Sequence, residues 1–268
     1  MGEIANFRRL VVKVGTSTVT HASGAPNLRR LDRLVCVLSD IKHTGRDVIL
    51  VTSGAIGVGV SRLGLPGRPS EVRYKQAAAA VGQCQLIHLY DKFFSEYGVT
   101  VGQILLSRDD VGEPSRRASL ENTFLTLFEW GSVPIVNEND SVSFDEIETG
   151  RQRLFGDNDT LSATVAELVN ADLLVLLTDI DALYSGDPRT DPDARPIPVV
   201  RAVDDALCAA AGSAGSARGT GGMMTKLAAA RMALAAGFDM VVASGEDPSI
   251  LYEIAAGRPA GTLFSRKH

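Results

Sequence analysis

The chain has 268 residues, of which 45% are hydrophobic and 22% charged, with a formal net charge of -5. This is enough apolar material for one large α/β domain or two small ones, and the acidic balance without a basic cluster argues against nucleic acid as a partner. No stretch approaches the ~18 apolar residues of a membrane span, so we expect a cytoplasmic protein with no membrane partner.

Strands and helices alternate along the first half of the chain. Short apolar runs indicate buried strands, and apolar residues at helical spacing indicate helices, two of which end at Gly45 and Gly131. Alanines 77–80 favour close packing, and another subunit is one candidate for what they pack against. The predicted strands are 10–15, 48–51, 99–106 and 133–136, and the predicted helices are 28–43, 76–97 and 119–130.

The second half continues this alternation, after a segment that predicts a β-hairpin with its turn at Thr149 and Gly150. The pattern predicts an α/β fold, a three-layer αβα sandwich with a mostly parallel central sheet. We expect a single domain, 1–268, with an N-terminal lobe over about 1–170 and a C-terminal lobe over about 171–268. The predicted elements are hairpin 142–155, helix 161–169, strand 173–177, helices 201–211 and 227–236, and strands 240–243 and 261–264.

Cysteine and histidine spacing argues against cross-links and metal sites. Cys36, Cys84 and Cys208 lie far apart on predicted helices, so we expect buried thiols in a reducing compartment. The four histidines show no metal-ligand spacing, so we expect no metal site in the protein itself.

One lysine interrupts the first apolar strand. Both faces of a central parallel strand are covered, and burying an unpaired ammonium group is costly. Lys13 therefore either reaches the surface or meets an anion at the carboxyl end of its strand. Gly15 follows it and offers a backbone N–H group beside the lysine.

A glycine-rich segment, 219–226, leads into the helix that Gly237 ends. Glycines let backbone N–H groups approach an anion, the helix adds the positive end of its dipole, and Lys226 adds a full charge. The alternative is a flexible surface loop. The segment does not have the spacing of a Walker A loop.

Polar residues follow several predicted strands at their carboxyl ends, where open α/β sheets bind ligands. Ser53 follows the second strand, Asn137 to Asp140 follow the fourth, and Thr178 and Asp179 follow the fifth. Solvated turns are the alternative explanation. Two isolated lysines and these polar ends favour phosphoryl transfer, which depends on positioning and charge neutralisation. Asp159 is either the cap of a helix or the carboxylate that aligns the two lysines.

Eight motifs in this order resemble the glutamate 5-kinases of the amino acid kinase family, whose fold is the carbamate kinase-like sandwich. The resemblance covers essentially the whole chain. The motifs are VKVGTS (12–17), VTSGAIGVG (51–59), KQAAAAVGQ (75–83), NENDSVS (137–143), FGDNDTLSA (155–163), LTDIDALY (177–184), DPR (187–189) and GTGGMMTK (219–226).

The resemblance implies ATP-dependent phosphorylation of the γ-carboxylate of L-glutamate, the first step of proline biosynthesis. It implies that glutamate is held by Ser53, Asp140, which would pair with the α-ammonium group, and Asn158, which would bond a carboxylate. Lys13 and Lys226 would flank the phosphoryl group, with Asp159 aligning both, and Mg²⁺ would arrive with the nucleotide. The implied ATP-binding residues are Lys13, Gly15, Thr178, Asp179, Thr220, Gly221, Gly222, Met223, Met224, Thr225 and Lys226.

The chain departs from the usual family pattern in two places. Many bacterial members carry a C-terminal domain of the PUA type, which we expect to be absent here, and the segment 141–155 is longer than usual. The resemblance also implies a homo-oligomer, a dimer or tetramer, and proline as a feedback inhibitor. The alternatives are a sibling kinase for acetylglutamate, aspartate or carbamate, and a metabolite sensor without catalysis, which would be expected to lack one of the two lysines.

Overall fold

The computed structural model describes residues 4, 6–142, 158–186, 191–205, 207–208, 222–258 and 260–266. In this part of the chain, eight strands form one sheet in the order β3-β4-β2-β1-β5-β7-β8-β6. The strand pairs are parallel except β7 with β8, so the predicted mostly parallel sheet is confirmed. The strands are β1 (Arg9–Val14), β2 (Asp47–Val51), β3 (Val101–Leu106), β4 (Val133–Glu138), β5 (Leu173–Thr178), β6 (Val199–Val200), β7 (Asp239–Ser244) and β8 (Thr262–Phe264).

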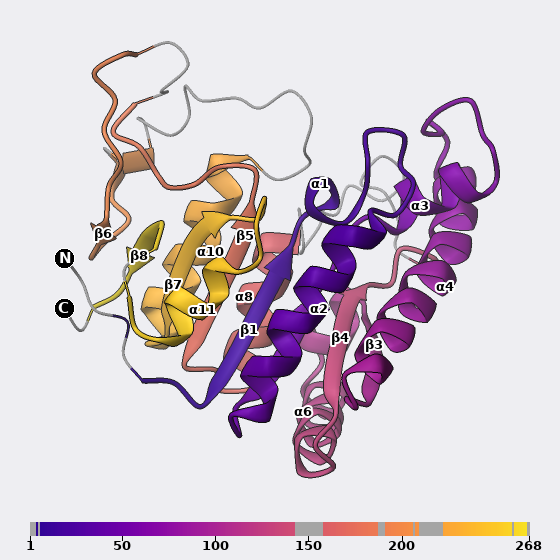
Figure 1. Ribbon diagram of the computed structural model, residues 1–268, viewed down its shortest axis with the longest axis horizontal. Coiled ribbons are helices and arrows are strands. Elements are labelled where there is room, and N and C mark those ends of the chain that lie inside the picture. Colours follow the sequence, from indigo (N-terminus) through magenta and orange to yellow (C-terminus); the bar gives the residue numbers. More distant parts are fainter. Residues whose placement is uncertain are drawn as a thin grey trace.

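Helices cover both faces of the sheet (Figure 1), as the predicted αβα sandwich requires. One apolar core lies under α2, α4 and α11, and the other lies under α6, α8 and α10. Successive residues of a strand point to opposite faces, and β1 accordingly sends Val12 into the first core and Val11 into the second. The helices are α1 (Thr16–Val19), α2 (Leu28–His43), α3 (Ala55–Arg62), α4 (Val72–Glu96), α5 (Arg108–Gly112), α6 (Pro114–Glu129), α8 (Asn158–Leu168), α10 (Met223–Ala236) and α11 (Ile250–Ala255).

Helices α3 and α4 cross at unusually close range. A Cβ atom added at Gly59 would lie 1.8 Å from the Ala78 carbonyl oxygen, and one at Gly82 would lie 1.8 Å from that of Ala55. The two backbones approach so closely because neither glycine carries a side chain. Ala78, in the run of alanines 77–80, therefore packs against α3 of the same chain, whereas Ala77 and Ala80 are exposed.

Two predictions fail within the described residues. Residues 201–204 are not helical, because Val199 and Val200 have been drawn into the sheet beside β8; the helix there includes residues 205, 207 and 208. The cysteines are free, as expected, but they are not buried: Cys84 is exposed and Cys36 and Cys208 are half-buried. The predicted hairpin lies outside the described residues except for Val142.

Across the described parts of the chain, no helix combines the length and apolar character that crossing a bilayer would need. The division into lobes near residue 170 stays a prediction. Strands from both proposed lobes belong to the same sheet, with β1 hydrogen-bonded to β2 on one side and to β5 on the other.

Candidate active site

The order in which strands are added to the sheet changes direction at β1. From β1 the chain proceeds outward through β2 towards the β3 edge, and it then returns to the other side of β1 as β5. In open α/β sheets, such a switch point leaves a crevice at the carboxyl ends of the strands, where ligands bind. The residues predicted to handle the phosphoryl group gather at this point.

Lys13 lies near the carboxyl end of β1, on the face that carries α8. The side chain shares this face with Val11, two residues earlier, because the strand alternates. Lys13 is only 8% exposed, so it does not reach the surface. Its Nζ lies 2.7 Å from Oδ1 of Asp159, so of the two predicted alternatives Lys13 meets an anion.

Asp159 lies in the first turn of α8 and is fully buried. Its second oxygen, Oδ2, lies 3.2 Å from Nζ of Lys226 and 2.9 Å from the hydroxyl of Thr225. Lys226 comes from the first turn of α10 and is 5% exposed. One carboxylate thus joins two lysines from distant parts of the sequence, through a different oxygen for each. The structure brings these three predicted residues together.

The charge state of Asp159 follows from its partners. Burial removes water from the carboxylate and would by itself raise its pKa, but the charges of Lys13 and Lys226 outweigh this effect. The pKa of Asp159 therefore lies below the ordinary value of 3.8. The carboxylate is ionised at neutral pH and can hold both ammonium groups.

The predicted glutamate-binding residues Ser53 and Asn158 also meet. Asn158 is the residue before Asp159, and its Nδ2 lies 2.6 Å from Oγ of Ser53 and 2.7 Å from the carbonyl oxygen of Thr52. Ser53 follows β2, and Gly54, with a positive φ of 97°, is the N-cap residue of α3. Asp140 lies two residues beyond β4 and is half-buried. Ser53 and Asp140 thus follow β2 and β4, on one side of β1, while Asn158 adjoins Asp159 in the first turn of α8.

The predicted nucleotide residues are placed on the other side of β1. Thr178 ends β5 and donates to Oδ1 of Asp179, which is exposed. Gly222 precedes α10, in whose first turn Met223 is half-buried and Met224 is 49% exposed. Gly15 adjoins Lys13, because a Cβ atom added to it would lie 3.8 Å from the lysine Nζ. Thr220 and Gly221 lie outside the described residues.

Several buried polar residues of this region were not singled out from the sequence. Nδ2 of Asn137 donates to Oε1 of Gln83 over 2.8 Å, and the hydroxyls of Thr52 and Tyr90 lie 2.8 Å apart. Burial raises the pKa of Tyr90, which keeps its proton for this bond. Asn137 is the first residue of the polar run 137–140, which the sequence indicated only as a whole. Gln83 could have been found as the polar residue at the end of the alanine-rich motif 75–83. Tyr90 gave no signal, because an aromatic residue in a helix ordinarily indicates core.

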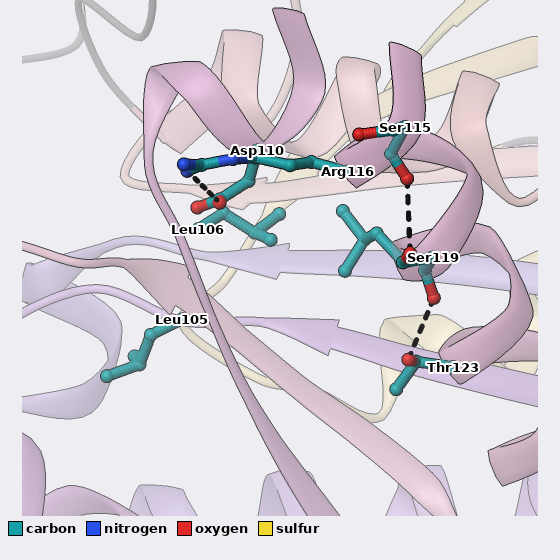
Figure 2. A pocket seen from close by; sticks show the side chains of 8 residues that line it. Leu105, Leu106, Asp110, Ser115, Arg116, Ser119 and Thr123 are labelled. Atoms are coloured by element: carbon teal, nitrogen blue, oxygen red, sulfur yellow. Dashed lines mark hydrogen bonds and ion pairs between the residues drawn. The ribbon is translucent and has the colours of Figure 1, made fainter. Parts of the chain in front are cut away.

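A separate groove lies along the edge of the sheet and has a volume of about 490 Å³. Figure 2 shows its lining, with Arg116 facing Asp110 and the hydroxyls of Ser119 and Thr123 bonded to carbonyl oxygens one turn earlier in α6. Its walls come from β3, α5 and α6 and include none of the predicted site residues. Because the lysine cluster lies at the switch point, the candidate active site is there and not in this groove.

The chain is similar to known proteins along nearly its whole length. The family model of the amino acid kinase family matches residues 8–244. Glutamate 5-kinase of Clostridium perfringens is 52% identical over 264 residues, covering 98% of this chain and 97% of the relative. Glutamate 5-kinase of Symbiobacterium thermophilum is 54% identical over 264 residues, covering 98% of each chain.

Solved structures support the fold. UMP kinase from Bacillus anthracis superimposes with a TM-score of 0.64 at 15% identity, over 98% of both chains. An isopentenyl phosphate kinase product complex from T. acidophilum gives 0.63 at 18% identity, over 96% of this chain and 99% of the other. At such low identity these two likenesses concern the fold alone. By the family model and by relatives about half identical over nearly the full length, the chain belongs to the amino acid kinase family and, within it, to the glutamate 5-kinases.

Proposed function

We propose that this protein transfers the γ-phosphoryl group of ATP to the γ-carboxylate of L-glutamate, forming γ-glutamyl phosphate and ADP. A new O–P bond forms at the carboxylate while the bond from phosphorus to the β,γ-bridging oxygen breaks, and no proton moves. The observation that carries this proposal is the contact of Lys13 and Lys226 with one buried carboxylate, Asp159, at the switch point of the sheet.

The two lysines would supply the charge that the reaction needs. Phosphoryl transfer spreads negative charge over the moving group, and catalysis consists mainly of placing positive charge around it. A pair of unit charges about 4 Å apart interacts by roughly 4 kcal/mol at an effective dielectric of 20. Asp159 would hold both ammonium groups in place before substrates arrive, so that little reorganisation is needed during transfer.

The acceptor needs no general base, because the γ-carboxylate of glutamate is already ionised at neutral pH. Ser53, Asp140 and Asn158 would hold the amino acid beside the lysines. Thr178, Asp179 and the segment that leads into α10 would hold the nucleotide.

Magnesium is part of the proposal as a companion of ATP. Both oxygens of Asp159 face ammonium groups, so this carboxylate is a poor ligand for a cation. Phosphate oxygens and water suit Mg²⁺ better, and the ion would neutralise phosphate charge from there.

The direct test is to trap the acyl phosphate with hydroxylamine while ADP release is measured. We expect both products with glutamate and ATP, and neither when acetylglutamate, aspartate or carbamate replaces glutamate. Release of ADP with one of those acceptors instead would identify a sibling kinase. Binding of both substrates without ADP or trapped product would contradict catalysis. Repeating the assay with proline, and measuring the molecular mass in solution, tests the proposed feedback inhibition and homo-oligomer.

Replacing Lys226 separates its proposed role from binding. Lys226→Ala is expected to lower kcat by about 100-fold or more, with the KM for glutamate changed by less than about threefold, because a group that acts on the transition state affects turnover first. Lys92→Ala, which removes an exposed lysine from α4, is the control. Equal losses in kcat and in glutamate affinity for Lys226→Ala would argue against its role at the phosphoryl group.

A further inference from the structure

Amide side chains form a hydrogen-bonded chain from α4 to the first residue of α8. Oε1 of Gln83 accepts from Nδ2 of Asn137 over 2.8 Å, and Oδ1 of Asn137 accepts from Nδ2 of Asn158 over 3.2 Å. Gln83 is 8% exposed and Asn137 is 2% exposed, so this chain lies below the surface of the site. Asn158, at its end, is half-buried.

Backbone partners fix which end of each amide is oxygen. The N–H of Glu138 can only donate, and it lies 2.9 Å from Asn137, so the atom that it meets is Oδ1. The Asn137 nitrogen must then face Gln83 and donate to it, so the accepting atom of Gln83 is Oε1. At the other end, the carbonyl oxygen of Thr52 can only accept, so the Asn158 atom 2.7 Å away is the nitrogen.

The nitrogen of Asn158 is fully used by the protein. It has two hydrogens, and three oxygens lie within hydrogen-bond distance: those of Thr52, Ser53 and Asn137. No N–H of this side chain remains for a ligand, so Oδ1 is the atom that it can offer. Because the Ser53 hydroxyl accepts from Asn158, its own hydrogen stays available to donate. The candidate site thus presents an acceptor at Asn158 and a donor at Ser53.

The position of Gln83 is itself held by packing. Gly82 precedes it in α4, at the crossing where a Cβ atom would lie 1.8 Å from the Ala55 carbonyl oxygen of α3. This contact leaves α4 little freedom to shift relative to α3, and therefore relative to the end of β2. Gln83 reaches the site through Asn137, because its Oε1 accepts from Nδ2 of that residue.

We propose that Gln83 is a positioning residue that sets the polarity of the acceptor site. Through Asn137 it holds Asn158 with its oxygen towards the ligand, so that Asn158 accepts from the α-ammonium group of the amino acid while the Ser53 hydroxyl donates to a carboxylate. This inference rests on the proposed function. It replaces the expectation that Asn158 bonds a carboxylate, since its nitrogen has no hydrogen left for one.

The test compares Gln83→Met with Gln85→Met, a half-buried glutamine two residues further along α4. The ligands are glutamate and glutarate, which has both carboxylates but no ammonium group. For Gln83→Met we expect a rise of about tenfold in the KM for glutamate, a change below twofold in the inhibition constant of glutarate, and an unchanged KM for ATP. Gln85→Met is expected to match the wild type in all three values.

A second variant distinguishes positioning from a general structural effect. Gln83→Glu keeps an oxygen acceptor opposite Asn137 and is expected to restore the KM for glutamate to within about threefold of the wild type. If Gln83→Met does not fold, as judged by thermal unfolding, Gln83→Asn withdraws the acceptor by one methylene group and carries the same expectations. An unchanged KM for glutamate, or equal weakening of glutamate and glutarate, overturns the inference. Failure of the wild type to phosphorylate glutamate would instead overturn the proposed function.

Discussion

At the scale of single residues, Asp159 is the side chain on which most of the site depends. Its two oxygens face different lysines, and each lysine is itself buried. An ion pair buried in this way is costly to break from one side, because the remaining charges then lack compensation. The residue thus matters for folding as well as for the proposed chemistry.

The stabilising effect of Asp159 should depend on pH. Its pKa is held below the ordinary 3.8 in the folded protein, so the ionised form favours folding above that value. At pH 7 we expect Asp159→Asn to lower the free energy of unfolding by about 3 kcal/mol. That difference should persist down to about pH 5 and then shrink below about pH 4, because the unfolded chain takes up a proton there before the folded protein does.

Urea unfolding of both proteins at pH 7, 5, 4 and 3 measures this difference. Asp91→Asn, which changes an exposed carboxylate on α4, is the control and should alter the free energy of unfolding by less than about 0.5 kcal/mol. A difference that grows as the pH falls would mean that the lysines do not hold the pKa of Asp159 down.

Sequence reasoning found residues whose burial carries a large cost in free energy. A lysine within an apolar strand demands an anion, and Lys13 has one. It did not find Gln83, because a single glutamine in a helix costs little to place and its partner Asn137 comes from a strand 54 residues away. Hydrogen-bond direction, which decides what Asn158 can offer, depends on backbone groups that only coordinates locate.

At the scale of elements, the crossing of α3 and α4 leaves the least room for an added side-chain atom. Gly82→Ala would place a methyl group against a backbone carbonyl that cannot move aside, and we expect a loss of about 2–3 kcal/mol in the free energy of unfolding. Gly57→Ala, within α3, meets nothing within 4 Å and should gain up to about 1 kcal/mol from helix propensity. Thermal and urea unfolding give both values. A neutral Gly82→Ala would show that the helices can separate without cost.

Element boundaries were harder to predict than elements. The helix predicted from residue 76 starts at Val72, and the one predicted from residue 119 starts at Pro114, because polar first turns carry no apolar period. Strand β6 has only two residues and follows Pro198, so its apolar run was too short to recognise. Its pairing with β8, far along the chain, is what converts the start of the predicted helix 201–211 into extended chain.

At the scale of the whole molecule, the two ends of the parallel strands differ. An arginine with several partners lies at the amino ends, and the candidate site lies at the carboxyl ends. Arg9 begins β1, and its guanidinium lies 3.1 Å from Oδ2 of Asp47 on β2, bonds the carbonyl oxygen of Val169 and stacks 4.5 Å from the ring of Phe128. Arg9 thereby ties the sheet to the segment that follows α8 and to α6.

Replacing this arginine should separate stability from activity. Arg9→Met is expected to lower the free energy of unfolding by about 2 kcal/mol, because Asp47 and the carbonyl group lose a partner, and to leave both KM values and kcat unchanged. Arg33→Met, which removes an exposed pair with Asp247, is the control and should cost less than about 0.5 kcal/mol. A kinetic effect of Arg9→Met as large as its effect on stability would contradict this separation.

The overall architecture could be predicted, but the order of strands could not. Alternating strands and helices determine a mostly parallel sheet covered on both faces. That β4 inserts between β2 and β3, and that β8 runs antiparallel beside β7, depends on which apolar faces fit together across long stretches of sequence. The strand ends that carry Ser53 and Thr178 were predicted as binding positions without knowledge of that order.

The lysine cluster also has a consequence for the translation of this protein on the ribosome. Lys13 and Lys226 are separated by roughly 200 residues, which a ribosome adds in roughly 10 to 40 s at about 5–20 residues per second. During that interval Lys13 has left the exit tunnel while Lys226 has yet to be translated. A nascent polypeptide can therefore assemble much of the sheet around β1 while it still lacks one of the two lysines proposed to act on the phosphoryl group.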